Sequence, residues 1–388
     1  ENPTVSRNDV PPSTSTLDAS KLKVKITENP KNVPDTIDSS GLQTTDHMIF
    51  AEWRADTGWD IPELVPYSPL SLDPTANVLH YSSGCFEGMR LYRGYDRKLR
   101  LLRPAHNCHR MLDSAHRSAL PSFDPDELLK LIRVLCATDA PKWLPNPEST
   151  LYIRPSLIGT EHGLGYSAAH KALLFIVLAM WPLPTNEKHL HLVTNDKNEV
   201  RAWPGGTGSQ KLGANYALGL SADQRAKANG ADQVLWLFGS NKEVTEAGAS
   251  NFFVLWREAS SGTLQLVTPP LGDLILPGVM RRMVLDLARE VFPRVDIREE
   301  RFTIDDIILA NDQGRLVSAF TTGTASFILP VVSIKHDGRE IPINSAECRH
   351  ITLLKDMILD IVNGRQKSDW VDDIDAWHPH CVSASEQA

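Results

Sequence analysis

A lysine, a tyrosine and a glutamate stand close together in this chain, in a pattern that suits covalent chemistry. Lys211 and Tyr216 lie in the segment GGTGSQKLGANYALG, and Glu246 lies in the segment EVTEAGASNFF. Glycines have no Cβ, so the backbone around Lys211 can approach a flat ligand closely. A protein supplies an amine, a phenol and a carboxylate to pyridoxal phosphate: the lysine forms a Schiff base, and the carboxylate keeps the pyridine nitrogen protonated. Because a lysine in a glycine-rich loop is more often simply solvated, other motifs must decide between the two interpretations.

An ordered series of further motifs runs from about residue 41 to about residue 365. Together with the lysine segment, these motifs resemble the branched-chain aminotransferases, which are pyridoxal-phosphate enzymes of fold type IV, and most closely the eukaryotic members. One such motif is a weak signal, whereas a series in the family's order is a strong one. The motifs are TDHM (45–48), LHYSSGCFEGMRLYRG (79–94), RLLRPAHNCHRML (100–112), SFDPDELL (122–129), LYIRPSLIGTEHGLG (151–165), RAWPGGTG (201–208), VTPPLGDLILPGVMRR (267–282) and TTGTAS (321–326).

The resemblance implies an α/β fold of fold type IV, with two α/β domains and the active site between them. The length agrees, since 388 residues exceed what one hydrophobic core usually serves. We therefore expect five parts, which are a disordered or extended N-terminal segment (1–40), a small N-terminal α/β domain (41–183), an interdomain linker (184–190), a large C-terminal domain that carries the lysine (191–375) and a C-terminal tail (376–388).

Hydrophobic spacing predicts several individual elements within these parts. Apolar residues recur at helical intervals in 124–137, with Asp124 as N-cap, and in 277–292, with Pro277 near the helix start. The apolar run 172–181 predicts a buried strand and is too short to cross a bilayer. The segments 234–238 and 251–256 read as an antiparallel pair of strands.

The resemblance assigns the cofactor contacts residue by residue. Lys211 is the catalytic and cofactor-attaching lysine, Tyr216 contacts the phenolic oxygen of the cofactor, and Glu246 pairs with its pyridine nitrogen. A helix that starts near Pro277 would bind the phosphate through free backbone N–H groups, because the first turn of a helix leaves such donors unpaired. The phosphate ligands implied are Val279, Met280, Thr324 and Arg110.

The substrate pocket is implied by the same resemblance. It must accept both an apolar branched side chain and the γ-carboxylate of glutamate, which requires aromatic walls and a conditional polar contact. The residues implied are Tyr81, Phe86, Tyr152 and Arg154, with the backbone N–H of Ala325 for the α-carboxylate.

Three departures from the family wording touch substrate recognition and leave the cofactor residues intact. Ala249 stands where the family has a threonine, and Tyr166 stands where a smaller aliphatic residue is usual. The segment after Trp181 is short and lacks the Gly-Tyr-Phe wording of the family. We expect transamination to be retained, while the preferred amino donor and the pathway stay open.

Composition excludes other classes of function. The net charge of −8 and the absence of any Lys/Arg-rich block disfavour binding to nucleic acid and to anionic membranes. The five cysteines show no CxxC and no metal-ligand spacing, which indicates reduced thiols and no metal site. Residues 1–20 are polar and predicted to be disordered. We expect a cytoplasmic protein, with the mitochondrial matrix as the alternative because the chain does not begin with Met.

Three functions compete on this basis. The first is transamination of L-leucine, L-isoleucine and L-valine with 2-oxoglutarate by a homodimer of the kind that the resemblance implies. The second is a fold-type-IV relative with other chemistry, such as a transaminase of an amine, a D-amino acid or another hydrophobic amino acid, or an aminodeoxychorismate lyase. The third is a silent protein that binds pyridoxal phosphate. The long motif series argues against the second, and intact Lys211, Tyr216 and Glu246 argue against the third.

Overall fold

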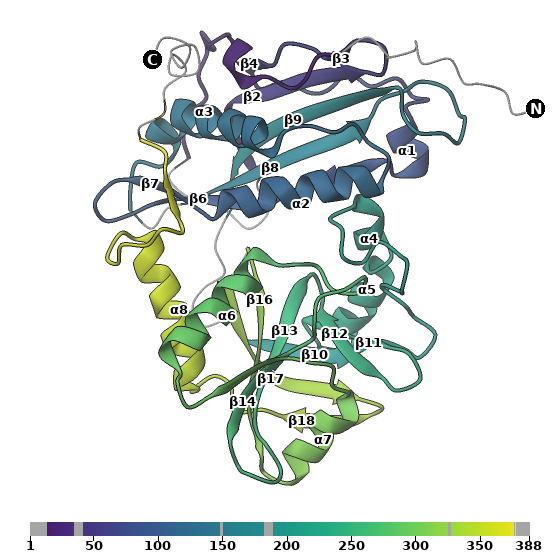
Figure 1. Cartoon of the computed structure of the whole chain (residues 1–388), viewed down its shortest axis with the longest axis vertical. Coiled ribbons are helices and arrows are strands. Elements are labelled where there is room, and N and C mark those ends of the chain that lie inside the picture. Colours follow the sequence, from purple (N-terminus) through teal and green to yellow (C-terminus); the bar gives the residue numbers. More distant parts are fainter. Residues whose placement is uncertain are drawn as a thin grey trace, which may run out of the picture.

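Two β-sheets with their helices divide the molecule into two lobes (Figure 1). The computed structural model describes residues 14–34, 42–147, 150–181, 189–324, 327–375 and 377. We call the first sheet with α1 to α3 the first lobe, and the second sheet with α4 to α8 the second lobe. No helix among the described residues is both long and apolar enough to cross a membrane.

The first lobe is a mainly antiparallel 10-stranded sheet with α2 and α3 packed across one face (Figure 1). Its main path runs β1-β4-β2-β9-β8-β6-β7-β19, with β3 beside β2 and β5 beside β8. The elements are η1 (Ala19–Lys21), β1 (Lys23–Val24), β2 (Gln43–Arg54), β3 (Gly58–Trp59), β4 (Glu63–Pro66), α1 (Asn77–Tyr81), β5 (Gly84–Phe86), β6 (Met89–Arg93), β7 (Leu99–Leu102), α2 (Pro104–Arg117), α3 (Pro125–Trp143), β8 (Thr150–Gly159), β9 (Lys171–Met180) and β19 (Val371–Asp373).

The second lobe is a 9-stranded sheet whose path runs β12-β11-β10-β17-β16-β13-β14-β15, with β18 beside β17. An additional pairing of β12 with β13 joins the path to itself, so the strands from β12 to β13 form a closed ring. The elements are β10 (Leu190–Thr194), α4 (Gly213–Ala217), α5 (Leu220–Ala228), β11 (Gln233–Phe238), β12 (Glu243–Ala247), β13 (Ser250–Arg257), β14 (Leu264–Thr268), α6 (Val279–Val291), β15 (Asp296–Glu299), α7 (Ile304–Asp312), β16 (Leu316–Gly323), β17 (Phe327–His336), β18 (Arg339–Pro342) and α8 (Arg349–Val362).

The two helices and the long strand predicted from hydrophobic spacing are confirmed. α3 begins after Asp124, whose carboxylate accepts a 2.9 Å hydrogen bond from the backbone N–H of Asp126. The predicted helix at 277–292 is α6, which buries Met283, Val284 and Leu287 against the second sheet. The apolar run 172–181 forms β9, in which alternate side chains are buried. The residue spacing therefore places these elements correctly.

The expected pairing of 234–238 with 251–256 is wrong, because β12 lies between these two strands. β11 pairs with β12, and β12 pairs with β13. The intervening segment EVTEA carries two glutamates, and glutamate is disfavoured in strands, so the sequence reads as a loop. Buried partners satisfy the Glu246 carboxylate, which allows this residue to lie inside a strand.

Disorder is also the wrong prediction for residues 14–20. Leu17 and Ala19 are buried in the core of the first lobe, and the Ala19 backbone N–H donates to the Glu127 carboxylate over 2.6 Å. The polar average composition of this segment hides its two anchoring apolar residues. Residues 1–13 lie outside the described part of the chain.

The predicted domain boundaries stay predictions. Most of the expected linker lies outside the described residues, and within it Leu190 already begins β10. Of the expected tail, only Trp377 is described. Near the end of the chain, β19 pairs with β7 and so belongs to the first sheet.

The stacked pair of Phe253 and Phe320 supplies a stability prediction for the second lobe. Both rings are buried, their centroids are 4.9 Å apart, and their planes are nearly parallel. Phe253→Ala leaves a cavity and should lower the free energy of unfolding by about 3–5 kcal/mol. Urea unfolding followed by tryptophan fluorescence measures this loss. The control Leu309→Ala, at an exposed position on α7, should change stability little; a loss as large as that of Phe253→Ala would contradict the prediction.

Candidate active site

Lys211 belongs to the second lobe, but the first lobe fixes its backbone. Its carbonyl accepts a 3.1 Å hydrogen bond from the Phe86 N–H on β5, and its N–H donates to the Ser114 hydroxyl on α2 over 2.9 Å. The next residue, Leu212, is buried in the core of the first lobe. These contacts therefore fix the backbone of Lys211 at the junction of the two lobes.

The Lys211 side chain lies between two aromatic rings. Its Nζ donates to the Tyr216 hydroxyl over 2.9 Å and lies 5.1 Å from the centroid of the Phe86 ring. The pKa of Lys211 is lowered to about 8, mainly by burial and secondly by the nearby positive charge of Arg110. Burial raises the pKa of Tyr216 to about 12, so the phenol stays neutral near pH 7. An amine with this pKa is unprotonated far more often near neutrality than an exposed lysine, which suits a nucleophile and a base.

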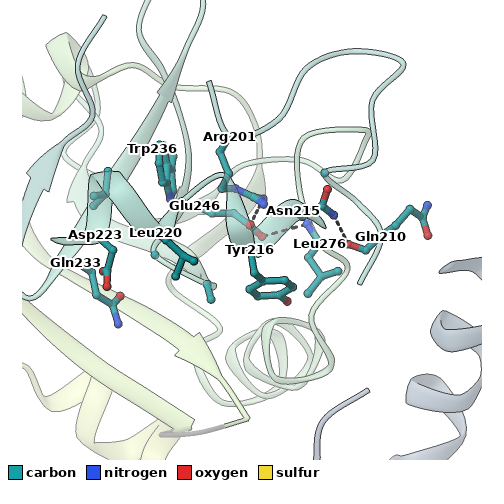
Figure 2. Close-up of a pocket in the computed structure, with 15 residues that line it drawn as sticks. Arg201, Gln210, Asn215, Tyr216, Leu220, Asp223, Gln233, Trp236, Glu246 and Leu276 are labelled. Carbon is teal, nitrogen blue, oxygen red and sulfur yellow. Dashed lines mark hydrogen bonds and ion pairs between the residues drawn. The ribbon is translucent and has the colours of Figure 1, made fainter. Parts of the chain in front are cut away.

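Glu246 lies on β12 and is held by three donors, of which Figure 2 shows Arg201 and Leu276. Its Oε1 accepts from Asn251 Nδ2 over 2.9 Å and from the Leu276 N–H over 3.0 Å. Its other oxygen, Oε2, pairs with the Arg201 guanidinium. A carboxylate oxygen has two lone pairs, so Oε1 is saturated and Oε2 keeps the remaining acceptor capacity. Burial raises the pKa of Glu246, and the charge of Arg201 opposes that rise.

A pocket of about 240 Å³ lies beside these groups (Figure 2). Tyr216, Glu246, Leu276, Gln233 and Ala249 are among the residues that line it. The Tyr216 phenol, the Glu246 carboxylate and Ala249 thus line the same pocket, and Ala249 is one of the positions where the sequence departs from the family. Its size suits a small ring bound between polar groups.

The start of α6 provides an anion-binding end of the site. Val279 and Met280 are the first two residues of this helix, where backbone N–H groups have no partner within the helix. Arg110 on α2 donates from Nη1 to the Pro277 carbonyl over 3.0 Å, which places its guanidinium beside the helix start. Gly278 is required here, because a Cβ would collide with the Asn251 side chain that holds Glu246.

These residues fit pyridoxal phosphate. The Lys211 amine suits the aldehyde, the free lone pair of Glu246 suits a protonated pyridine nitrogen, and the helix start with Arg110 suits the phosphate. Thr324, at the end of β16, is held through its carbonyl, which accepts a 3.1 Å bond from Arg90 Nε. The predicted contact of Ala325 falls outside the described residues.

On the predicted substrate side, three of the four named side chains come together. The Arg154 guanidinium lies 4.5 Å from the Phe86 ring centroid and donates to the Tyr152 hydroxyl over 2.9 Å. A Cβ on Gly88 would strike that hydroxyl, so the glycine permits this close packing. Tyr81 stands apart, since its hydroxyl donates to the Leu164 carbonyl and its side chain is 40% exposed.

The sequence motifs did not single out several charged and amide side chains that hold these groups in place. Arg201 opens the motif RAWPGGTG, and Glu87 and Arg90 lie within the motif that contains Phe86. Ionisable residues inside otherwise apolar motifs were the signal that could have indicated them, because a charge that is buried needs an oppositely charged or hydrogen-bonding partner. The sequence could not say which acid pairs with which base. The residues missed are Glu87, Arg90, Asn107, Arg201 and Asn251.

Comparison with known proteins identifies the family. The model of the family described as "Amino-transferase class IV" matches residues 84–334. The chain belongs to this family. It is 42% identical over 332 residues to the "Branched-chain-amino-acid aminotransferase, cytosolic" of Saccharomyces cerevisiae, covering 84% of this chain and 88% of the relative. It is 40% identical over 340 residues to the mitochondrial branched-chain-amino-acid aminotransferase of Rattus norvegicus, covering 86% and 85%.

The fold of this class IV aminotransferase also matches solved structures. The branched-chain amino acid aminotransferase of Escherichia coli superposes with a TM-score of 0.66 at 23% identity, covering 84% of this chain and 99% of that one. The predicted family and the predicted α/β fold of fold type IV are confirmed.

The lowered pKa of Lys211 supplies a testable pH dependence. Only the unprotonated amine reacts with an acylating reagent, so in the cofactor-free protein its modification rate should rise with pH through a midpoint of about 8. Mass spectrometry of the peptide that contains Lys211 measures this rate. In urea the amine loses its burial, and the midpoint should move towards the ordinary lysine value of about 10.4. Equal midpoints in the folded and unfolded protein would contradict the prediction.

Proposed function

We propose that this protein catalyses the pyridoxal-phosphate-dependent transamination of L-leucine, L-isoleucine and L-valine with 2-oxoglutarate, giving branched 2-oxo acids and L-glutamate. The observation that carries the proposal is the buried Lys211 amine beside Tyr216, with Glu246 and Arg110 placed around it. The printed names of the yeast and rat relatives support the substrate class.

Each residue has a chemical task in this proposal. Pyridoxal phosphate supplies, when bound, an aldehyde for the substrate amine and a ring that accepts electron density from the substrate Cα. Lys211 Nζ takes the proton from that Cα, and neutral Tyr216 holds the amine in place. Glu246 Oε2 accepts from the protonated ring nitrogen. Arg110 and the start of α6 hold the phosphate, which fixes the reacting atoms beside the lysine.

The cluster of Phe86, Tyr152 and Arg154 suits both kinds of substrate. Phe86 and Tyr152 offer aromatic surface to a branched apolar side chain. Arg154 lies against both rings, and its buried Nε has no hydrogen-bond partner among the described residues. That free donor suits the distal carboxylate of glutamate and 2-oxoglutarate, whereas leucine places only methyl groups there.

The function is tested first by visible absorbance of the purified protein with pyridoxal phosphate. The band of the bound cofactor should bleach with both L-leucine and L-glutamate, because the proposed enzyme accepts an amino group from each. D-alanine and a simple chiral amine serve as negative controls. Bleaching by these donors alone would move the substrate to another fold-type-IV activity, and no band at all would overturn the role of Lys211.

A drifted substrate is the second candidate, and one observation favours it. Ala249 lines the pocket next to Glu246 and Tyr216, and its methyl group offers no hydrogen bond to a substrate carboxylate. An enzyme that has drifted in this way would still bleach with L-amino acids, but its kcat/KM would be highest for a donor other than leucine, isoleucine or valine.

Arg154 allows the two substrate classes to be separated. Arg154→Gln removes a charge-assisted hydrogen bond, which contributes about 1.5–3 kcal/mol, so kcat/KM for 2-oxoglutarate should fall roughly tenfold or more. The value for leucine, measured in the half-reaction, should change much less. The control Tyr81→Phe alters an aromatic residue that stands apart from Arg154 and should leave the leucine-to-glutamate ratio unchanged. Equal losses for leucine and glutamate in Arg154→Gln would contradict the assignment.

The proposed ligands are small amino acids and oxo acids. As a macromolecular partner we propose a second copy of this chain, giving a homodimer. An exposed apolar cluster on the first lobe supports a second copy as partner, because contiguous patches of this kind often mark interfaces. Tyr81 contacts both Leu164 and Tyr166 there, and Tyr166 is 92% exposed. Sedimentation equilibrium against the chain mass of 43.1 kDa measures the assembly.

The proposed compartment is the cytoplasm, with the mitochondrial matrix as the alternative. Relatives with each of these printed locations match this chain at similar identity. Fractionation of cells that carry a C-terminally tagged protein distinguishes the two.

A further inference from the structure

Glu87 is a fully buried carboxylate at the junction of the lobes, between β5 and β6. Its Oε1 accepts from Arg110 Nε over 2.6 Å, and its Oε2 accepts from Arg110 Nη2 over 2.8 Å. Asn107 Nδ2 and the Gly88 N–H also donate to Oε2, over 2.9 and 3.0 Å. Asn107 and the Gly88 N–H therefore fix the carboxylate, which pairs through both oxygens with one edge of the Arg110 guanidinium.

The contacts of Arg110 leave a defined set of donors for a ligand. A guanidinium carries five N–H groups in a rigid plane. Glu87 takes two of them, and the Pro277 carbonyl takes one from Nη1 over 3.0 Å. One N–H on each terminal nitrogen remains, and the Pro277 contact places these beside the first turn of α6. A buried ion pair is weak evidence for stability, so orientation is the better explanation for this pair.

We propose that Glu87 is the positioning residue of the phosphate-binding arginine: it fixes the inner edge of Arg110, so that the remaining N–H groups face the phosphate at the start of α6. The inference rests on the cofactor site of the proposed function. Glu87 touches neither cofactor nor substrate in this role and acts only through Arg110. Its bidentate grip requires both a negative charge and the full length of a glutamate side chain.

The charge of Glu87 also affects the lysine. Arg110 and Arg154 both lower the pKa of Lys211, whereas Glu87 and Tyr152 raise it, and Tyr216 accepts a hydrogen bond from its amine. Without the Glu87 charge, Tyr152 and the more distant Glu246 alone would oppose the effect of Arg110 on Lys211. Position and charge can therefore be separated by two substitutions.

The first experiment compares the affinity of the cofactor-free protein for pyridoxal phosphate and for pyridoxal, which lacks the phosphate. Glu87→Asp keeps the charge but is too short for the bidentate grip, and Glu87→Gln keeps the length but offers one acceptor. Each variant should lower the preference for the phosphate form by about tenfold, while the affinity for pyridoxal changes little. If either variant weakens both ligands equally, or keeps the wild-type preference, the proposal is overturned.

The second measurement is the pH midpoint of Lys211 acylation in the same cofactor-free variants. Glu87→Gln should shift this midpoint to lower pH, because the group that opposes Arg110 has lost its charge. Glu87→Asp should leave the midpoint close to that of the wild type. Equal midpoints in both variants, whether shifted or not, would contradict the separation of charge from position.

Asp139→Asn is the matched control. Asp139 is also a buried acid of the first lobe, but it pairs with His47 through a 2.6 Å contact. This substitution should lower stability and leave both the phosphate preference and the Lys211 midpoint unchanged. A shift in either quantity would mean that the effects of the Glu87 variants come from a general loss of stability, which would contradict the proposal. Failure of the cofactor site in the proposed function looks different, since the wild-type protein would then show no preference for pyridoxal phosphate over pyridoxal.

Discussion

Buried charge at the junction of the two lobes is the constraint on which the site depends. Lys211, Arg110 and Arg201 bring positive charge into a region largely closed to water, and Glu87 and Glu246 bring negative charge. A charge removed from water is costly unless hydrogen-bonded partners surround it. The arginines pair with the two acids, whereas the lysine faces a neutral phenol. Burial and the nearby charge of Arg110 therefore lower the pKa of Lys211.

Contacts between the lobes maintain this arrangement. The Lys211 backbone is held by β5 and α2 of the first lobe, although the helix that follows it, α4, belongs to the second. Arg110 crosses in the opposite direction, from α2 to the chain just before α6. Arg90 adds a third crossing, from β6 to the carbonyl of Thr324. These three contacts fix the Lys211 backbone, the start of α6 and Thr324 relative to the first lobe.

The sequence predicted the regular elements well and the charge pairs poorly. Helical spacing located α3 and α6, because an amphipathic helix repeats its apolar residues wherever it packs. The motif series located Lys211, Tyr216, Glu246 and Arg110, and the structure brings these residues together. The partnership of Glu87 with Arg110 was not accessible, since it joins residues far apart in the chain through a fold that spacing alone does not specify. β12 was missed for a related reason, because only tertiary partners make a glutamate acceptable in a buried strand.

The strand β19 has a consequence for how the two lobes can move. The chain passes from the first lobe to the second before β10, and it returns after α8 to pair with β7 at the edge of the first sheet. Ile374, next to that strand, is fully buried in the core of the first lobe. Both ends of the second lobe are thus joined to the first lobe. Any motion that separates the lobes widely must therefore either break the pairing of β19 with β7 or extend the chain between α8 and β19.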